Sequence, residues 1–421
     1  MNTMRELIKK ENHFSMIEIL MFLVLFLLAF RFLGQQSEYI AVLAVLWLIR
    51  LVQKNVPITF NAEYLVLVVT FLLYIVFYSF NYGADPSVIF QWVFGVPVMY
   101  GIGSVMGAGN TKKNVALILV LALGMFLHGF INFINHDFAT QGRNPIDIWT
   151  GSYLAATQQN VFFTMGVALF FPALFVMRGK LIKILAVFLF AATILNSMAT
   201  ATRTGMLLPA LSFLVILIVF IAENRKTPHK LKYVFLFLVA AFFLLLIVFI
   251  FNVFGIREKI LNSPLFNRDE SSGLDPRFTY WYRTLAYMFQ YPFGGAEFRQ
   301  LCGNYAHNLW LDIIQNAGIL VGLLYLAYTV MTFVNIVKLF KNKKVPVSLR
   351  YILLSEYASI MINCMIETIL DGVPLMLLLF FLLNGMTAKL NEVYSSGTVQ
   401  KPLFEPSKTG SADSKIQESR R

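Results

Sequence analysis

The sequence predicts an all-α integral membrane protein with about twelve transmembrane helices and one large external loop between spans 9 and 10. Of the 421 residues, 58% are hydrophobic and only 13% are charged, whereas a soluble domain carries roughly 25% charged residues. Apolar runs recur along the chain at about the 20 residues that a helix needs to cross a bilayer. These runs are continuous and lack the two-residue alternation of barrel strands, so they predict helices.

We place the spans on these apolar runs. The expected spans are residues 16–34, 38–53, 63–80, 87–107, 114–135, 156–177, 181–200, 205–222, 231–255, 308–337, 350–370 and 373–391. The first run is too long for a signal-peptide core and lacks a small-residue cleavage site, so we interpret it as the first span. Residues 1–391 then form one polytopic membrane domain. We expect the polar tail 392–421 to be disordered and cytoplasmic.

The charge pattern predicts the orientation. With the N-terminus in the cytoplasm, clusters of Lys and Arg fall in every cytoplasmic segment, and the short external links 35–38, 81–86 and 371–372 have none. We therefore expect both termini in the cytoplasm. The same clusters account for the net charge of +12, which otherwise would suggest an anionic partner such as nucleic acid; we expect none.

The basic residues expected outside are nearly all arginines, and most belong to the long loop 255–306. They are Arg143, Arg203, Arg257, Lys259, Arg268, Arg277, Arg283 and Arg299. The planar guanidinium is favoured where a carboxylate or phosphate must be held by two hydrogen bonds. No Walker loop, dinucleotide fingerprint or Cys/His metal cluster occurs, and we interpret Cys302 and Cys364 as packing residues.

Within the loop, residues 276–289 form an amphipathic stretch in which aromatic residues alternate with Arg277 and Arg283. This pattern is typical of a helix lying on lipid headgroups. One interpretation is a simple interfacial anchor. The other is that the two arginines bind a lipid diphosphate at that depth.

Two further arginines lie in other external segments. Arg203 follows a very short turn of small residues, 199–202, and is either a snorkelling residue or a fixed cation aimed at a phosphate. Arg143, in the link 135–151, is a weaker candidate for substrate contact.

His307 and Asn308 open the tenth predicted span. At about 100° per residue, a continuous helix would place His307 and Gly318 on one face. A helix start with a histidine is suited to an anion, and Gly318 would allow another helix or a lipid chain to approach closely. The alternative is a capping or interface histidine.

The eleventh span carries Glu356, Asn363, Glu367 and Asp371, at spacings that would share one helical face. Acids within a membrane are functional candidates, and Glu367 and Asp371 fall near the external end. The alternative is a structural ion pair, for instance with Arg203.

Several of these elements together resemble the O-antigen ligase and O-antigen polymerase superfamily of bacterial envelope glycan assembly. The resemblance covers about residues 185–340 and rests on Thr202-Arg203-Thr204-Gly205, Arg277-Phe278-Thr279-Tyr280-Trp281, Pro292-Phe293-Gly294-Gly295 and Ala306-His307-Asn308-Leu309-Trp310, with Gly318 following. The twelve expected spans and the long late external loop agree with it.

The resemblance implies a glycosyltransferase that takes an oligosaccharide from undecaprenyl diphosphate and needs no metal or cofactor. It implies that Arg203, Arg277 and Arg283 stabilise the diphosphate as negative charge develops on it, and that His307 takes the acceptor proton or binds phosphate. Glu367 or Asp371 would orient the acceptor sugar or His307. Asn308, Gly318 and Arg143 complete the expected substrate site.

Within this class we expect a polymerase of repeat units, with a ligase acting on a lipid or protein acceptor as the alternative. Other classes are a transporter or flippase of the glycan precursor, which the acidic residues favour, and a membrane scaffold. We expect the protein in the bacterial cytoplasmic (inner) membrane, with its active face external or periplasmic. Expected partners are the lipid-linked glycan, membrane lipids, and flippase and chain-length regulator proteins.

Overall fold

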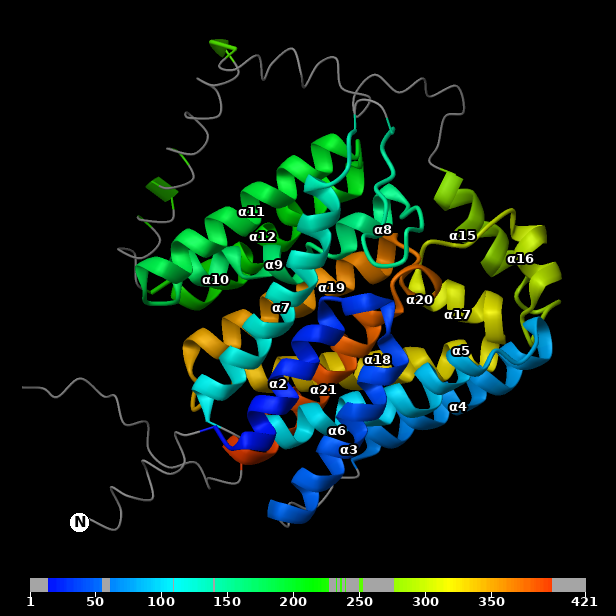
Figure 1. Ribbon diagram of the computed structural model, residues 1–421, viewed down its shortest axis with the longest axis horizontal. Coiled ribbons are helices and arrows are strands. Elements are labelled where there is room, and N and C mark those ends of the chain that lie inside the picture. Colours follow the sequence, from blue (N-terminus) through cyan, green and yellow to red (C-terminus); the bar gives the residue numbers. More distant parts are fainter. Residues whose placement is uncertain are drawn as a thin grey trace, which may run out of the picture.

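The computed structural model describes residues 14–54, 61–108, 110–138, 141–226 and 276–395, with a few positions between 232 and 252. This part of the chain is built from helices that lie side by side in a bundle, as Figure 1 shows. It contains no β-strand beyond one isolated bridge between Ile146 and Tyr153.

The helices follow one another in this order along the described chain. In the first half they are α2 (Met16–Ala29), η1 (Phe32–Gly34), α3 (Gln36–Lys54), α4 (Ala62–Tyr82), α5 (Pro86–Phe90), the π-helix η2 (Gln91–Gly95), α6 (Val96–Gly107), α7 (Thr111–Ile134), α8 (Ala156–Val161), α9 (Thr164–Ala168) and α10 (Phe170–Phe175). In the second half they are α11 (Lys180–Ala199), α12 (Arg203–Asn224), α15 (Pro276–Tyr287), α16 (Ala296–Cys302), α17 (Leu309–Ala317), α18 (Ile319–Lys341), α19 (Val347–Ile366), α20 (Ile369–Gly372) and α21 (Pro374–Ser395).

Ten segments of this described chain are long and apolar enough to cross a membrane, counting Pro86–Gly107 and Ala156–Phe175 as one each. The prediction of an all-α membrane protein is thereby confirmed. Helix α2, the first expected span, has only 14 residues. Most of the ninth expected span, 231–255, lies outside the described residues. The same holds for residues 255–275 of the expected external loop and residues 396–421 of the expected tail. The number of twelve spans therefore stays a prediction.

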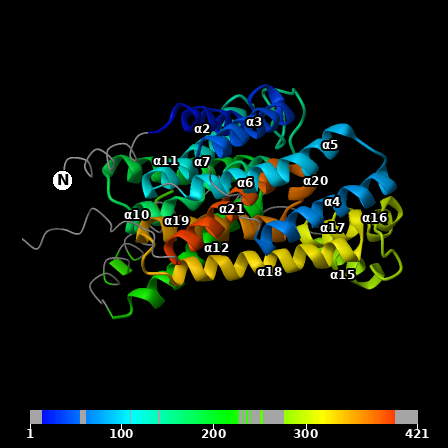
Figure 2. The ribbon, with the colours of Figure 1, turned by 90° about the horizontal axis from the view of Figure 1, so that it is seen from below.

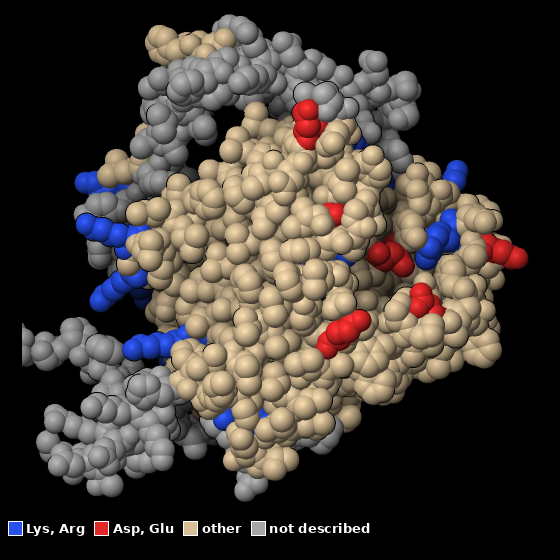
Figure 3. Space-filling model, in the orientation of Figure 1, with Lys and Arg blue, Asp and Glu red and all other residues tan. Residues whose placement is uncertain are grey.

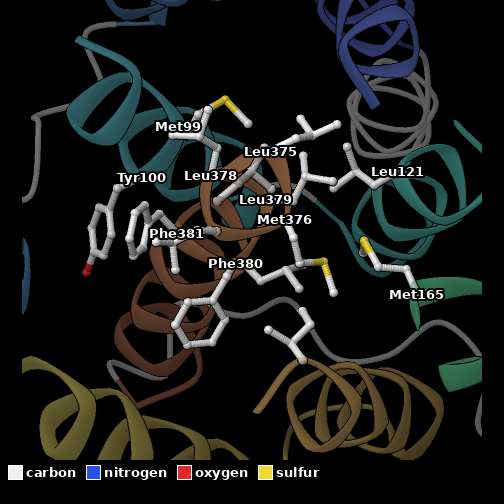
Figure 4. Close-up of a cluster of buried hydrophobic side chains, with 14 of the residues drawn as sticks. Met99, Tyr100, Leu121, Met165, Leu375, Met376, Leu378, Leu379, Phe380 and Phe381 are labelled. Atoms are coloured by element: carbon white, nitrogen blue, oxygen red, sulfur yellow. The ribbon is translucent and has the colours of Figure 1, made fainter. Parts of the chain in front are cut away.

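Helix α21 forms the centre of the bundle. In its most apolar stretch 83% of the residues are buried, which agrees with its sequence of Leu and Phe on every face. Figure 4 shows Phe381 of α21 beside Tyr100 of α6, with Phe380 pointing in another direction and Met165 of α9 on a further side. In the turned view of Figure 2, α21 runs between α6 and α18.

Helices α6 and α21 touch through their backbones. A Cβ atom on Gly103 would lie 1.9 Å from the carbonyl oxygen of Leu382, and one on Gly385 would lie 1.9 Å from that of Tyr100. Small residues let helices approach in this way in membranes, where dispersion contacts replace the hydrophobic effect as the main attraction. The pair Gly103 and Gly385 therefore sets the distance between the two helices.

One end of the bundle, which we call the basic end, collects Lys and Arg, visible along the left edge of Figure 3. Some of these cations are ion-paired rather than free. Glu18 of α2 accepts from Arg50 of α3 and lies 2.7 Å from Nζ of Lys113 of α7. Three helices are thus joined by one buried carboxylate. Arg50 and Lys113, which the positive-inside argument counted as cytoplasmic charges, therefore also stabilise the packing of these helices.

Some expected helix boundaries are wrong. The span expected at 156–177 is three short helices, α8, α9 and α10, interrupted near Phe162 and Leu169. The helix expected to run to residue 370 ends at Ile366. The external helix expected at 276–289 is α15 and ends slightly earlier, at Tyr287.

The contact of α6 with α21 predicts the effect of one substitution. Gly385→Leu should lower the free energy of unfolding by at least about 3 kcal/mol, because the new side chain meets backbone that has no room to move. The measurement is the melting temperature and the monodisperse fraction in detergent. Ala41→Leu, on an exposed face of α3, is the matched control and should change neither. Equal behaviour of the two variants would contradict the packing described.

Candidate functional site

The other end of the bundle, the site end, carries α15, α16, α17 and α20, all on the right in Figure 1. In the same orientation, Figure 3 shows a hollow in the surface where α17 and α20 lie, with acidic and basic side chains at its rim. The start of α12 and the end of α19 also reach this end of the molecule.

A buried polar network holds the turn before Arg203. Asn196 of α11 donates to Oδ1 of Asn160 at 2.6 Å, and Asn160 in turn donates to the hydroxyl of Thr202. The hydroxyls of Thr200 and Thr202 lie 3.0 Å apart. Because these residues are buried and bonded to α8 and α11, the backbone that carries Arg203 is fixed. Arg203 itself is the first residue of α12 and its side chain is exposed.

Glu367 lies where three elements meet. Its Oε1 is 3.5 Å from Nη2 of Arg277 on α15, and its carboxylate is buried. The hydroxyls of Thr204, next to Arg203 in the chain, and of Thr157 on α8 also face it. The structure thus brings Arg277 and Thr204, the residue after Arg203, to the same carboxylate.

The backbone around His307 is anchored on several sides. Trp281, one helical turn after Arg277, donates from Nε1 to the carbonyl oxygen of Ala306 at 2.6 Å. The amide of Ala306 donates to Oδ1 of Asp312 at 2.8 Å. His307 has a φ of 55°, a left-handed conformation that is costly for residues with a side chain. Such strain is typical of functional sites, and here the neighbouring contacts maintain it.

Asn308 caps α17. Its Oδ1 accepts from the amide of Leu311 at 3.3 Å, and its Nδ2 donates to the carbonyl oxygen of Met365 at 3.4 Å. Met365 precedes Glu367 by two residues, so this bond fixes His307 relative to Glu367. In the structure, Asn308 holds the start of α17 against the end of α19.

The continuous helix expected over 308–337 is wrong. It is two helices, α17 and α18, separated at Gly318, whose φ is 86°. His307 lies before the cap and Gly318 lies in the break, so they do not share a helical face. A Cβ on Gly318 would lie 2.1 Å from the carbonyl oxygen of Pro292. Gly318 therefore admits the turn 292–295, rather than a helix or a lipid.

The single acidic face expected on the eleventh span is also wrong. Glu356 and Asn363 belong to α19, Glu367 is in extended backbone after it, and Asp371 lies in the separate helix α20. Glu367 and Asp371 consequently have different neighbours. Glu356 is fully buried in α19, away from both.

Asp371 belongs to a second cluster with Arg299 and Asn316. Nη2 of Arg299 is 4.0 Å from Oδ2 of Asp371, and Nδ2 of Asn316 donates to the same oxygen at 3.3 Å. Arg299 also donates to Oδ1 of Asn316. The guanidinium lies 4.9 Å from the ring centre of Tyr82 and 4.2 Å from that of Tyr305, a cation–π arrangement.

Of this second cluster, the sequence interpretation of the site included Asp371 but not Arg299, Asn316 or the two tyrosines. Arg299 was recognised only as one of several external arginines. Asn316, which is fully buried, and Tyr82 gave no sequence signal, because they come from helices far apart in the chain. Beyond Asp371, the only sequence signal that pointed to this cluster was the excess of arginine in the loop 255–306, which includes Arg299.

Arg283 and Arg143 lie apart from Glu367 in the described contacts. Arg283 is exposed and is about 120° around α15 from Arg277. A Cβ on Gly303 would lie 3.3 Å from its Nη1, so it lies over the end of α16. Arg143 is exposed in the loop that precedes α8. Their roles in substrate binding stay predictions.

Comparison with known families decides the class. The profile of the family described as O-antigen ligase matches residues 185–326, which contain Arg203, Arg277, His307 and Gly318. This match, over about a third of the chain, confirms the resemblance to the O-antigen ligase and polymerase superfamily. The match indicates a ligase- or polymerase-type function, and therefore a glycosyl-transferring membrane enzyme. No curated protein matches the chain.

Three carboxyls at the site end hold their protons more tightly than usual. Burial raises the pKa of Glu367, although the Arg277 guanidinium opposes the rise. Burial likewise raises the pKa of Asp371 against the effect of Arg299. The pKa of Asp312 is raised well above its usual value by burial and by the neighbouring Asp371. Such groups are candidates for moving a proton during glycosyl transfer.

Among the described residues, no three His, Cys, Asp or Glu side chains are arranged to hold a metal ion. Metal independence stays a prediction from the resemblance. Cys302 and Cys364 are both buried and not joined in a disulfide, in agreement with their interpretation as packing residues.

The raised pKa of Glu367 predicts a pH-dependent difference in stability. Because the folded protein binds this proton more tightly than the unfolded chain, the stabilisation is complete below the unfolded pKa and is lost as pH rises through the folded pKa. Gln cannot titrate. The melting temperature of Glu367→Gln minus that of the wild type should therefore increase between about pH 4 and about pH 8. A flat or falling difference for Glu367→Gln over this range would refute the burial argument.

The second cluster predicts the effect of removing Asn316. Asn316→Ala should lower the free energy of unfolding by about 3 kcal/mol, because the buried Tyr74 and the partly exposed Arg299 and Asp371 each lose a hydrogen bond. Thermal unfolding in detergent measures this change. Asn304→Ala, at an exposed position nearby, should stay within about 0.5 kcal/mol of the wild type. A loss no larger than that of the control would show that the cluster contributes little.

Proposed function

We propose that this protein polymerises oligosaccharide repeat units carried on undecaprenyl diphosphate, at the external face of the bacterial cytoplasmic membrane. The observation that carries the proposal is the meeting of Arg277, the Arg203 turn and the anchored His307 segment around Glu367. Both termini are cytoplasmic in this proposal, because the Lys and Arg clusters of the basic end then obey the positive-inside rule. The site end consequently faces outward.

The reaction in this proposal is a displacement at the anomeric carbon of the donor. The hydroxyl oxygen of the acceptor bonds to that carbon, and the bond from carbon to the diphosphate oxygen breaks. The electron pair leaves on undecaprenyl diphosphate. His307 takes the hydroxyl proton and later returns it to solvent, so atoms and charges balance.

The arginines stabilise the leaving diphosphate. Arg203 and Arg277 are held by buried structure, the first by the Asn160 network and the second by Glu367. Preorganised cations aimed at developing charge supply the largest share of such catalysis. Glu367 prevents Arg277 from turning away and is a positioning residue in this scheme. Arg283, exposed on the same helix, is assigned to the outer part of the diphosphate or its lipid.

The second candidate is a ligase that transfers finished glycan to a lipid or protein acceptor. The description of the matching family, O-antigen ligase, favours it. The two candidates share the donor and differ in the acceptor, so the product distinguishes them. In either case flippase and chain-length regulator proteins are the expected partners.

The test is deletion of the gene and complementation with wild type, Arg203→Ala, Arg277→Ala or His307→Ala at matched protein levels. Each variant should reduce transfer about a hundredfold, the usual effect of removing one such stabilising group. The readouts are the size ladder of surface glycan and the undecaprenyl-linked pool. Single repeat units in place of a ladder support a polymerase, and long chains left on undecaprenyl diphosphate support a ligase.

Arg225→Ala, an exposed arginine at the basic end, is the matched control and should complement fully. Normal glycan in all three site variants would contradict the catalytic assignment. Transport of the lipid-linked precursor would then be the better proposal.

A further inference from the structure

A polar pocket lies on the side of α20 that carries Asp371. Its volume is about 510 Å³, within the range of about 300–1,000 Å³ that small-molecule sites occupy. The polar side chains that matter here are Gln36, Ser37 and Glu38 at the start of α3, Gln91 of η2, Thr150, and Asp371. The proposed function so far assigns nothing to this pocket.

The charges of the pocket disfavour a phosphate. Arg31 also lines it, but its Nη1 is 3.2 Å from Oδ2 of the buried Asp147, so this cation is already paired. The remaining charged groups that line it are the carboxylates of Glu38 and Asp371; the Arg299 guanidinium, 4.0 Å from Asp371, does not line the pocket. An anionic ligand would meet like charge here, whereas an uncharged or amino-bearing ligand would not.

Two glutamine side chains of the pocket each have an amide atom without a hydrogen-bond partner. Oε1 of Gln36 and Nε2 of Gln91 are both buried and neither has a hydrogen-bond partner. Buried polar atoms are nearly always bonded. One of these atoms accepts and the other donates, and a sugar hydroxyl does both. Their pairing with ligand hydroxyls would satisfy both groups.

The wall that carries Arg31 and Thr150 is rigid. Oδ1 of Asp147 accepts from the amides of Trp149 and Thr150 at 2.9 and 3.2 Å, and its Oδ2 is 3.3 Å from Nε2 of His128. Trp149 packs against Phe30 and Phe32, with ring centres 5.5 and 4.9 Å apart. Preformed walls of this kind reduce the ordering that a ligand must impose.

The pocket is close to the proposed reaction centre. Asp371 and Glu367 are four residues apart, which separates them by at most about 14 Å of extended chain. Glu367 faces Arg277, and Asp371 faces the pocket. Helix α20 therefore lies between the side that carries Arg277, here called the arginine side, and the side that carries the pocket.

We propose that the polar pocket binds an uncharged or amino-bearing sugar of the acceptor glycan, while the diphosphate of the donor lies on the arginine side of α20. This inference rests on the proposed function and adds the chemistry of the acceptor to it. It also assigns Gln36, Gln91 and Thr150 to acceptor binding.

The first experiment measures saccharide binding to the full-length protein in nanodiscs, with an array of neutral, amino, acidic and phosphorylated mono- and disaccharides. The wild type should bind neutral or amino saccharides and not sugar phosphates. Gln91→Leu and Thr150→Val should each weaken that binding about tenfold, because ligand hydroxyls lose a partner. Gln300→Leu, at an exposed position of α16, should bind as the wild type does. Two variants are used so that a folding defect in one, seen in its melting temperature, does not decide the result.

The second experiment uses inorganic diphosphate as the probe. Arg277→Ala should weaken diphosphate binding about tenfold and leave saccharide binding unchanged, and Gln91→Leu should do the reverse. If no saccharide binds, if sugar phosphates bind best, or if neither pocket variant weakens the binding, the inference is wrong while the proposed function stands. If Arg277→Ala instead supports normal glycan in cells, the proposed function itself is wrong.

Discussion

The backbone contact between α6 and α21 determines the geometry of the site end. Gly103 and Gly385 bring the two helices together until carbonyl oxygens nearly touch the opposite backbone. Helix α21 begins at Pro374, directly after α20, and α6 continues from η2. The contact therefore fixes how far Asp371 of α20 lies from Gln91 of η2. Because the interior of a membrane offers no water to fill a gap, this distance has little freedom to vary.

The sequence predicted the membrane fold, since apolar runs leave a strong local signal. These runs located the ten spans of the described chain, while the arginine excess led to the prediction of a site at Arg203 and Arg277. The breaks in helices were not predicted. Gly318 lies in an apolar run that reads as one helix, and only the approach of Pro292 explains why the helix stops there. Likewise, His307 was placed on a helical face because its left-handed backbone has no signature in the sequence.

The partners of the charged residues could not be predicted either. Arg277 pairs with Glu367 across 90 positions of the chain, and Arg299 contacts Tyr82 over a longer separation still. A single sequence carries no information about such pairs unless a motif brings them together. The buried polar network beneath Arg203 illustrates the same limit, because Asn160 and Asn196 look like unremarkable residues within apolar helices. What the structure adds is the different surroundings of the two acids, with Glu367 facing Arg277 and Asp371 facing Arg299 and the pocket.

The π-helix η2 gives the pocket an unusual evolutionary property. A π-turn contains one residue more than the α-helical turn it replaces, and it is readily gained or lost by insertion or deletion of a single codon. Loss of one residue within Gln91–Gly95 would restore a regular helix and rotate the preceding turn by about 100° relative to α6. Gln91 would then leave the pocket wall while the glycine contact with α21 stayed intact. Relatives that differ by one residue in this stretch should therefore keep the same bundle and recognise different glycans.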